Sequence, residues 1–193
     1  MKKVSKEFVL VMIWFGLLFG VFSLTLSVAQ EQYLDKNGVL IFEASEKLFE
    51  EVKATNKSVT TIYDTATNKI ASLALMKGFH FKNSLMEEHF NENYIESGTY
   101  PKAKFRGTLI DFDPKADLNK NGKKVRVKGT LEVRGKEKDI DTTLDILKVQ
   151  DIISITGEFV VSPADFDIEI PGIVRNKIAK EVKVMLDFKL KRK

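Results

Sequence analysis

The feature that most constrains this chain is a two-residue alternation of apolar and polar side chains. In the stretch VRVKGTLEVRG, which begins at Val125, every second residue is apolar or glycine, and the residues between them are charged or Thr. Successive side chains of a β-strand point to opposite faces, so this period is typical of a strand with one dry and one wet face. Strands of this kind belong to antiparallel sheets that are exposed on one side. We therefore expect an all-β protein.

Eight segments in all are candidates for such strands. Several connectors between them carry hairpin-turn residues, namely ATN at 66–68, NKNG at 119–122 and RGKE at 134–137. Consecutive strands joined by short turns favour an up-and-down barrel or a β-sandwich. No repeat or linker divides the chain after residue 29, so we expect one domain over residues 30–193. The candidate strands are 38–44, 56–64, 69–81, 104–112, 125–135, 140–147, 152–161 and 181–191.

Residues 1–29 resemble a secretory signal peptide. Three lysines in the first six residues precede an uncharged stretch from Phe8 to Ala29, which ends in the small-residue sequence SVA that a signal peptidase reads. We expect cleavage after Ala29 and a periplasmic or secreted protein. An uncleaved membrane anchor is the alternative, because about 20 apolar residues also span a bilayer.

Composition excludes several classes of function. The chain has no Cys, which excludes disulfides, thiolate metal sites and lipid attachment through a lipobox cysteine. Its formal net charge is +4, and the first 29 residues contribute three Lys and one Glu, which leaves +2 for residues 30–193. The charged residues are interspersed rather than grouped, so we expect no nucleic-acid partner.

Two segments depart from the alternation. In NSLMEEHFNENY, Ser84 and Glu87 have the spacing of a capping box, which predicts a short helix with Met86 and Phe90 on one face and His89 on the wet face. The segment PADFDIEIPGIVRNKIAKE, residues 163–181, is expected to cross one end of the sheet structure before the last strand. The first segment would then close an end of a barrel.

Three glycines, Gly107, Gly129 and Gly157, fall in the apolar register of separate strands. A glycine in a strand marks a bend or a close approach of backbone or ligand. The sequence leaves open whether these glycines curve the strands or leave room for an internal channel. An eight-stranded barrel is at the size where side chains fill the interior or one small ligand occupies it.

The chain resembles the YceI-like family of lipid- and polyisoprenoid-binding proteins. The resemblance covers nearly all of residues 30–193 and is strongest in FHFKNSLMEEHFNENYIESGTYPKAKFRGTL, VKGTLEVRGKEKDI and ITGEFVVSPADFDIEIPGIVRNKIAKEVKV. The segment MEEHFNENY resembles a subgroup from Bacteroidetes-type bacteria. The resemblance implies an eight-stranded antiparallel lipocalin-like barrel with one or two short helices. It also implies an apolar cavity for an isoprenoid or fatty-acyl lipid, and it brings no catalytic residues and no cofactor.

The inward-facing residues near the predicted helix are the candidates for the cavity wall. Tyr94, Asn93 or Lys77 would orient a lipid head group at the open end. The predicted ligand-binding set is Leu75, Phe79, Phe81, Phe90, Phe105, Leu109, Val127, Gly129, Leu131, Phe159 and Phe166.

Catalytic and metal sites find little support in the sequence. His80 lies between two inward phenylalanines and should point outward, and two His without Cys make a poor zinc set. The run from Asp117 resembles a calcium loop, but its twelfth position is Lys128 and its flanks are strands, so a turn explains it better. Lys77 shares the parity of Leu75 and Phe79, so either the strand is irregular there or Lys77 reaches a carboxylate or head group.

We therefore expect a binding protein rather than an enzyme. It would hold an isoprenoid or acyl lipid for transport, storage or sequestration, and it would touch a membrane only while lipid is loaded. The alternative is a structural or interaction module of the cell envelope with a filled barrel and no ligand, because a fold does not fix a function. The oligomeric state is left open by the sequence.

Overall fold

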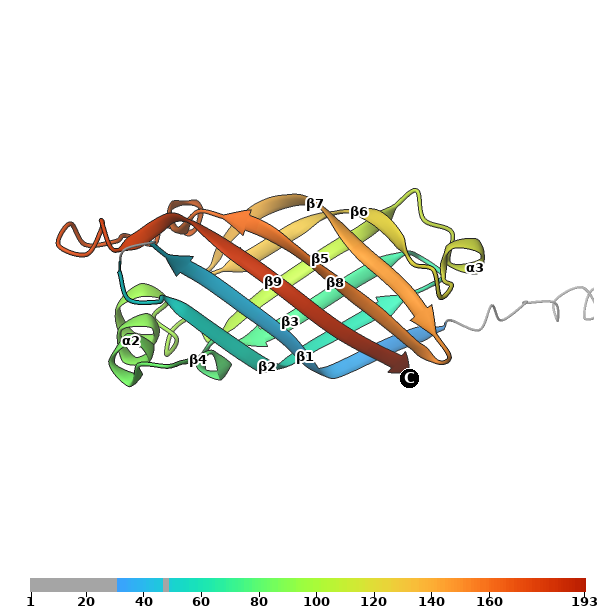
Figure 1. The fold of residues 1–193 in the computed structure, drawn as a ribbon, viewed down its shortest axis with the longest axis horizontal. Helices are drawn as coiled ribbons and strands as arrows, with labels where there is room; N and C mark the ends of the chain where they lie inside the picture. The colour runs from blue at the N-terminus through green and yellow to red at the C-terminus, as the bar shows by residue number, and fades with distance from the viewer. Residues whose placement is uncertain (1–30, 47–48) are drawn as a thin grey trace, which may run out of the picture.

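The computed structural model describes residues 31–46 and 49–193, which form one closed antiparallel β-barrel with short helices at its two ends (Figure 1). The strands are β1 (Gln32–Ser45), β2 (Lys53–Asp64), β3 (Lys69–Leu75), β4 (His80–Phe81), β5 (Lys102–Ile110), β6 (Lys123–Val133), β7 (Lys136–Val149), β8 (Ile152–Val161) and β9 (Ile178–Arg192). The helical turns are η2 (Met76–Gly78), α2 (Ser84–His89), η3 (Phe90–Tyr94), α3 (Pro114–Asp117) and η4 (Pro163–Phe166).

Strand pairing follows the chain almost without exception. The order is β1-β9-β8-β7-β6-β5-β3-β2, and β1 also pairs with β2, which closes the barrel. The two-residue β4 pairs with β2 beyond the end of β3. The predicted eight-stranded antiparallel lipocalin-like barrel is therefore confirmed. Closure matters physically because it leaves no open edge of unpaired backbone groups.

The hairpin turns have the predicted chemistry. Arg134 and Gly135 both have positive φ, +49° and +70°, as a two-residue turn between right-twisted strands requires. Gly122 has φ +72° and ends the connection that leads into β6. In that connection Asp117 pairs with Lys123 at 2.6 Å and the Asn119 side chain accepts from the Asn121 amide, so the calcium-like residues build a turn.

A single turn of 3-10 helix interrupts the predicted strand 69–81. Ser72 and Ala74 face the interior, so Leu75 points outward and is 48% exposed, and the three residues of η2 then reset the register before Phe79. Lys77 lies on this turn and is exposed. The predicted inward position of Leu75 was wrong because parity was counted through an unbroken strand. Irregular backbone is thus the correct account of Lys77.

The buried side chain of Asn56 fixes this interruption. Its Nδ2 donates to the Leu75 carbonyl at 3.0 Å, and its Oδ1 accepts from the Ser58 amide at 2.9 Å. A Cβ on Gly78 would lie 2.7 Å from the Asn56 amide nitrogen, so the turn packs directly against it.

The predicted helix is present as α2 and continues as the π-turn η3. Its N-cap is Asn83 and not Ser84, because the Asn83 side chain accepts from the amides of Leu85 and Met86. Glu87 does not complete a capping box either. Its carboxylate accepts from the Phe81 amide at 3.0 Å and lies 3.2 Å from the ring of His80, which is exposed as predicted. A capping box forms instead on η4, between Ser162 and Asp165.

Burial changes along several strands and divides the interior into two halves. On β6, Val125 and Val127 are fully buried, whereas Leu131 and Val133 are only half-buried. Strand β8 repeats the pattern, with Ile153 buried near the α3 end and Phe159 half-buried near the α2 end. The α3 half of the barrel is therefore filled with side chains, and the α2 half is not.

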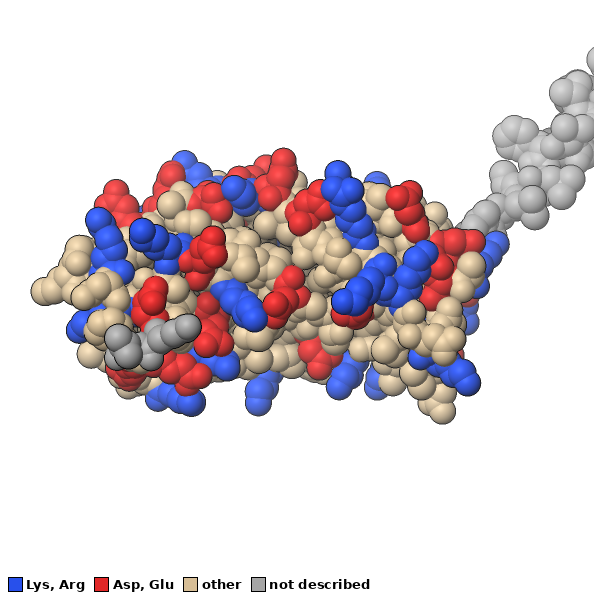
Figure 2. All heavy atoms as spheres, turned by 45° about the horizontal axis from the view of Figure 1, so that its top comes forward, with Lys and Arg blue, Asp and Glu red and all other residues tan. Residues whose placement is uncertain are grey.

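Charged side chains lie on the outer wall. On the face that Figure 2 shows, Lys and Arg are interspersed with Asp and Glu, with no large area of one sign. Arg126 and Asp141 make one such pair across β6 and β7, and this hydrogen-bonded pair lowers the pKa of Asp141 to about 2. The predicted signal peptide, residues 1–29, lies outside the described residues. Within the described residues, the helices are too short to cross a membrane.

Candidate ligand-binding cavity

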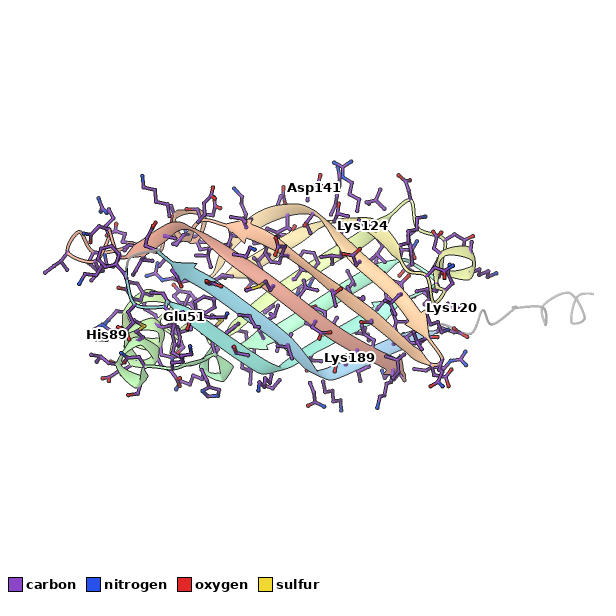
Figure 3. The ribbon with its side chains drawn as sticks, viewed as in Figure 1. Glu51, His89, Lys120, Lys124, Asp141 and Lys189 are labelled. Carbon is purple, nitrogen blue, oxygen red and sulfur yellow. The ribbon has the colours of Figure 1, made fainter. Side chains whose placement is uncertain are left out.

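The α2 half of the barrel encloses a cavity of about 560 Å³, which is within the range of small-ligand sites. All eight long strands contribute side chains to it or to the core below it, and α2, η3, η4 and the segment before β9 surround its mouth. Figure 3 places His89 at this end of the barrel and Lys120 at the opposite end. The cavity thus has one open end and one closed end.

The floor consists of side chains that belong to both halves. Ile70, Val127, Leu144 and Phe188 line the cavity and are each at most 4% exposed. Below them the same cluster of buried side chains extends to Tyr63 and Leu190, both fully buried. Protein interiors are close-packed, so we expect a ligand chain to stop at this floor.

Phe105 lies flat against the wall because two glycines leave room for it. A Cβ on Gly107 or on Gly129 would lie 2.7 Å from the Phe105 ring, and Gly107 and Gly129 are directly paired across β5 and β6. The glycines do not open a channel at their own positions, and Gly129 does not line the cavity. They let a bulky ring lie along the sheet, which keeps it out of the lumen.

The same arrangement recurs at two other places on the wall. A Cβ on Gly157 would lie 2.5 Å from Leu144, and a Cβ on Gly38 would lie 2.5 Å from the Phe188 ring. Both covering side chains line the cavity. The glycines therefore widen the lumen indirectly, through the position of their neighbours.

Four phenylalanines form one cluster between the wall and α2. Phe42, Phe79, Phe81 and Phe90 have neighbouring ring centroids 5.2–6.1 Å apart, mostly in tilted or edge-on arrangements. These geometries are favourable for aromatic pairs. Phe90 begins the π-turn η3, so the cluster ties the helical segment to β1 and to the strand pair β2–β4.

Polar groups of the wall are already hydrogen-bonded within the protein. The hydroxyl of Ser72 bonds that of Thr61 at 2.9 Å, and the Thr142 hydroxyl donates to the Glu158 carbonyl at 3.2 Å. The buried polar side-chain atoms without a partner, among described residues, belong to Asn91, Arg134 and Asp187, none of which lines the cavity. The lumen therefore offers a ligand burial and shape, but few directed polar contacts.

Among the described residues, the ionisable side chains that line the cavity lie at its mouth. Glu50, His89, Tyr94 and Lys177 line it, and the Glu50 carboxylate accepts from the Asn83 side chain at 3.1 Å. No set of three or more His, Asp or Glu in the described part of the chain is close enough to hold a metal ion. Chemically, this end can contact a polar head group while the lumen holds an apolar chain.

Ion pairs hold the loops of the mouth in place. Arg134 bonds Glu96 after η3 and also donates to the Asp167 carbonyl, so it joins two loops to the β6–β7 hairpin. Lys138 and Lys136 pair with Asp165 and Asp167 of the η4 segment. Hydrogen bonds from these lysines hold the pKa of both carboxyl groups below its usual value.

The sequence matches the YceI-like domain over residues 32–190. The chain belongs to the YceI-like family. Among solved structures, a polyisoprenoid-binding domain from Saccharophagus degradans is similar to this barrel, with a TM-score of 0.73, 18% identity, and coverage of 84% of this chain and 98% of that one. No curated protein matches this chain at a significant level.

Two further solved structures share the fold. Burkholderia cenocepacia BcnA has a TM-score of 0.64 and 14% identity, and the match covers 78% of this chain and 95% of BcnA. A Campylobacter jejuni YceI protein has a TM-score of 0.61 and 16% identity, with coverage of 77% and 89%. At these identities the likeness establishes the fold of this YceI-like protein.

Eleven residues of this YceI-like chain were predicted from its sequence to contact a ligand, and the structure brings most of them to the cavity. Leu75 points outward, Gly129 is covered by the Phe105 ring, and Leu109 is buried in the filled half below the floor, so these three do not line it. The predicted residues that line it are Phe79, Phe81, Phe90, Phe105, Val127, Leu131, Phe159 and Phe166.

The predictions for the mouth were less accurate. Tyr94 lines the cavity, whereas Lys77 and Asn93 are exposed and do not. His89, expected on the wet face of its helix, is exposed but lies at the rim of the YceI-like cavity. The predicted set missed lining residues on β1, β7, β9 and the segment before β9. The period-two alternation of Ile140, Thr142 and Leu144 on β7 was a usable signal for that strand.

Proposed function

We propose that this YceI-like protein is an exported binding protein that holds one isoprenoid or fatty-acyl lipid. The apolar chain would lie in the lumen and the head group at the mouth. The observation that carries this proposal is the cavity of about 560 Å³, which is lined almost wholly by apolar side chains and is open at one end. A cavity with few directed polar contacts suits a ligand that is recognised by burial.

Two further findings support the proposal. The similar structure from Saccharophagus degradans is described as a polyisoprenoid-binding domain. The resemblance of residues 1–29 to a signal peptide supports export to the periplasm or beyond. Membership of a Bacteroidetes-type subgroup, suggested by the segment MEEHFNENY, remains a prediction.

The mechanism would be transfer of methylene groups out of water. Each methylene buried contributes about 0.8 kcal/mol, which is about fourfold in affinity. For a series of fatty acids or linear isoprenoid alcohols, we expect affinity to rise with chain length and then to level off when the chain reaches the floor at Val127 and Phe188. No covalent step is required, so the proposal is for a binding protein and not an enzyme.

Filling the lumen tests the proposal. Ala103 is half-buried, lines the cavity and pairs with Ala74 on the neighbouring strand, so Ala103→Phe places a ring in the lumen. Excluding two methylenes would weaken binding of the longest chains by about 15-fold. Titration of a fluorescent long-chain fatty acid measures the change.

Ala71→Phe is the matched control. Ala71 lies on the outer face of the same strand pair, opposite Arg106, and does not line the cavity. Its substitution should leave binding unchanged. Equal affinities for the wild type and a folded Ala103→Phe variant would contradict a ligand in the lumen, and they would favour the alternative of an envelope interaction module.

A further inference from the structure

The tip of the segment between η4 and β9 presents an unusually exposed apolar side chain. Ile173 is 86% exposed, more than the other exposed large apolar residues of the described chain. The segment extends past the end of the barrel beside the mouth (Figure 1). Hydrogen bonds from the Val174 amide to the Pro171 carbonyl, 3.0 Å, and from the Lys177 amide to the Val174 carbonyl, 2.9 Å, shape the tip. The tip is thus folded and still leaves Ile173 in water.

Two other exposed apolar side chains belong to the rim of the mouth. Phe49, in the β1–β2 connection, is 43% exposed, and Leu85, in the first turn of α2, is 57% exposed. Both also line the cavity, as does Val174 next to Ile173. At Phe49, Leu85 and Val174, the apolar surface therefore continues from the outside of the rim into the lumen.

Cationic side chains stand beside these apolar tips. Arg175 and Lys177 follow Ile173 in the same segment, which has no acidic residue between Pro171 and Lys177. Lys82 precedes Leu85. Basic side chains next to exposed apolar ones are typical of protein surfaces that sit at the interface of a bilayer.

Carboxylates at the same rim are partly engaged by neighbours. Glu50 bonds Asn83, Glu51 bonds Lys82, and Glu87 bonds the Phe81 amide. Glu88 and Glu92 are exposed on the helical segment, so the rim as a whole is not strongly basic. Attraction to a membrane would then come mainly from the apolar tip and less from charge.

We infer that the mouth of this barrel docks on the surface of a lipid bilayer, with Ile173 inserted among the acyl chains and Phe49 and Leu85 at the interface. This inference rests on the proposed function, since the docked mouth would let a lipid chain pass between bilayer and lumen without crossing water. The α3 end would face away from the membrane.

A single fluorescent label tests the orientation. The chain has no Cys, so Ile173→Cys gives one site for an NBD label, and Val149→Cys gives a matched site at the opposite end, where Val149 is 51% exposed. The exported protein, purified from its own cells, is mixed with vesicles of phosphatidylethanolamine and phosphatidylglycerol that carry a nitroxide-labelled lipid. We expect brighter NBD emission and nitroxide quenching at position 173 only. No quenching at 173, or quenching at 149 instead, overturns the inference.

A second comparison separates this inference from the proposed function. Ile173→Asp should slow transfer of a fluorescent fatty acid from these vesicles by about tenfold, because it removes the apolar side chain that would insert into the membrane. Val149→Asp should not slow it. When the same fatty acid is added from an ethanol stock without vesicles, its uptake should be equal in the wild type, the Ile173→Asp variant and the Val149→Asp variant.

The possible results distinguish lipid binding, which is the proposed function, from membrane docking. If no protein takes up fatty acid from solution, the proposed function fails. If all take it up from solution and transfer from vesicles is equally fast in the Ile173→Asp variant and the wild type, lipid binding stands and membrane docking fails.

Discussion

Phe105 illustrates how single residues make room inside this barrel. Its ring covers Gly107 and Gly129 and lies along the sheet, as Leu144 covers Gly157 and the Phe188 ring covers Gly38. A side chain on any of these glycines would displace its neighbour toward the lumen or strain the backbone. The glycines are therefore part of the wall, and each of them shapes the lumen through the neighbouring side chain that covers it.

Gly129 should be intolerant of even one added methyl group. A Cβ there would lie 2.3 Å from the Arg106 carbonyl oxygen and 2.6 Å from the Gly107 Cα, so the strand must shift. We expect Gly129→Ala to lower the free energy of unfolding by about 1–3 kcal/mol, the usual range for overpacking. Denaturant unfolding measures it.

Gly172→Ala is the control for this prediction. Nothing lies within 4 Å of a Cβ at that position, so its effect should stay within about 0.5 kcal/mol. Equal stability of the Gly129→Ala variant and the Gly172→Ala variant would mean that the close contact at Gly129 relaxes freely.

At the scale of the element, several long strands contribute to both halves of the barrel. On β6 and β8 the α3 half contributes fully buried side chains to the core, and the α2 half contributes half-buried side chains to the cavity wall, whereas no residue of β2 lines the cavity. The segments at the mouth bury a few side chains, such as Ile95 and Phe166, and ion pairs and caps also hold them. Asp165 of η4 is an example, because its carboxylate bonds Lys138 and also accepts from the Ser162 amide.

The contribution of Asp165 should depend on pH. The pairing with Lys138 lowers the pKa of Asp165 in the folded protein, so the stabilisation is present above the unfolded pKa of about 3.9 and is lost as pH falls through the folded pKa. Asp165→Asn removes the charge and keeps an oxygen for the Ser162 amide. The variant should therefore be less stable than the wild type above about pH 5, and the difference should vanish near pH 2.

Unfolding midpoints of both proteins across this pH range check the sign. A difference in unfolding midpoint between the two proteins that stays constant down to pH 2 would show that the charge of the Asp165 carboxylate does not contribute to stability. Lys138→Gln is the partner control, because it should reproduce the loss above pH 5 and abolish the effect of Asp165→Asn.

For the whole molecule, alternation and turn chemistry are local signals, and they predicted antiparallel strands in a barrel or a sandwich, between which the resemblance to the YceI-like family selected the barrel. Strand number, hairpin turns and most of the phenylalanines of the cavity wall followed from these signals. Leu75 was misplaced in register because η2 is stabilised by Asn56, which is 19 residues away in sequence. Gly129 and Leu109 were assigned to the cavity because parity shows which residues face inward, but not where the filled half ends.

That boundary is a property of three-dimensional packing. Leu109 and Leu131 face the same interior from adjacent strands, yet one is 2% exposed in the core and the other lines the cavity. Only the relative stagger of the strands and the position of the helical segment decide which inward residues meet a partner. The molecule thus combines a solid half, which supports the fold, with a hollow half at the mouth.

The most direct test of the lipid-binding proposal is native mass spectrometry of the protein purified from its own cells, followed by lipid extraction. We expect one bound lipid per protein chain, with a long isoprenoid or acyl chain, and a protein mass that corresponds to residues 30–193 if the signal segment is removed. A protein that is bare as purified, and still bare after incubation with isoprenoid quinones and fatty acids, would contradict lipid binding in this cavity.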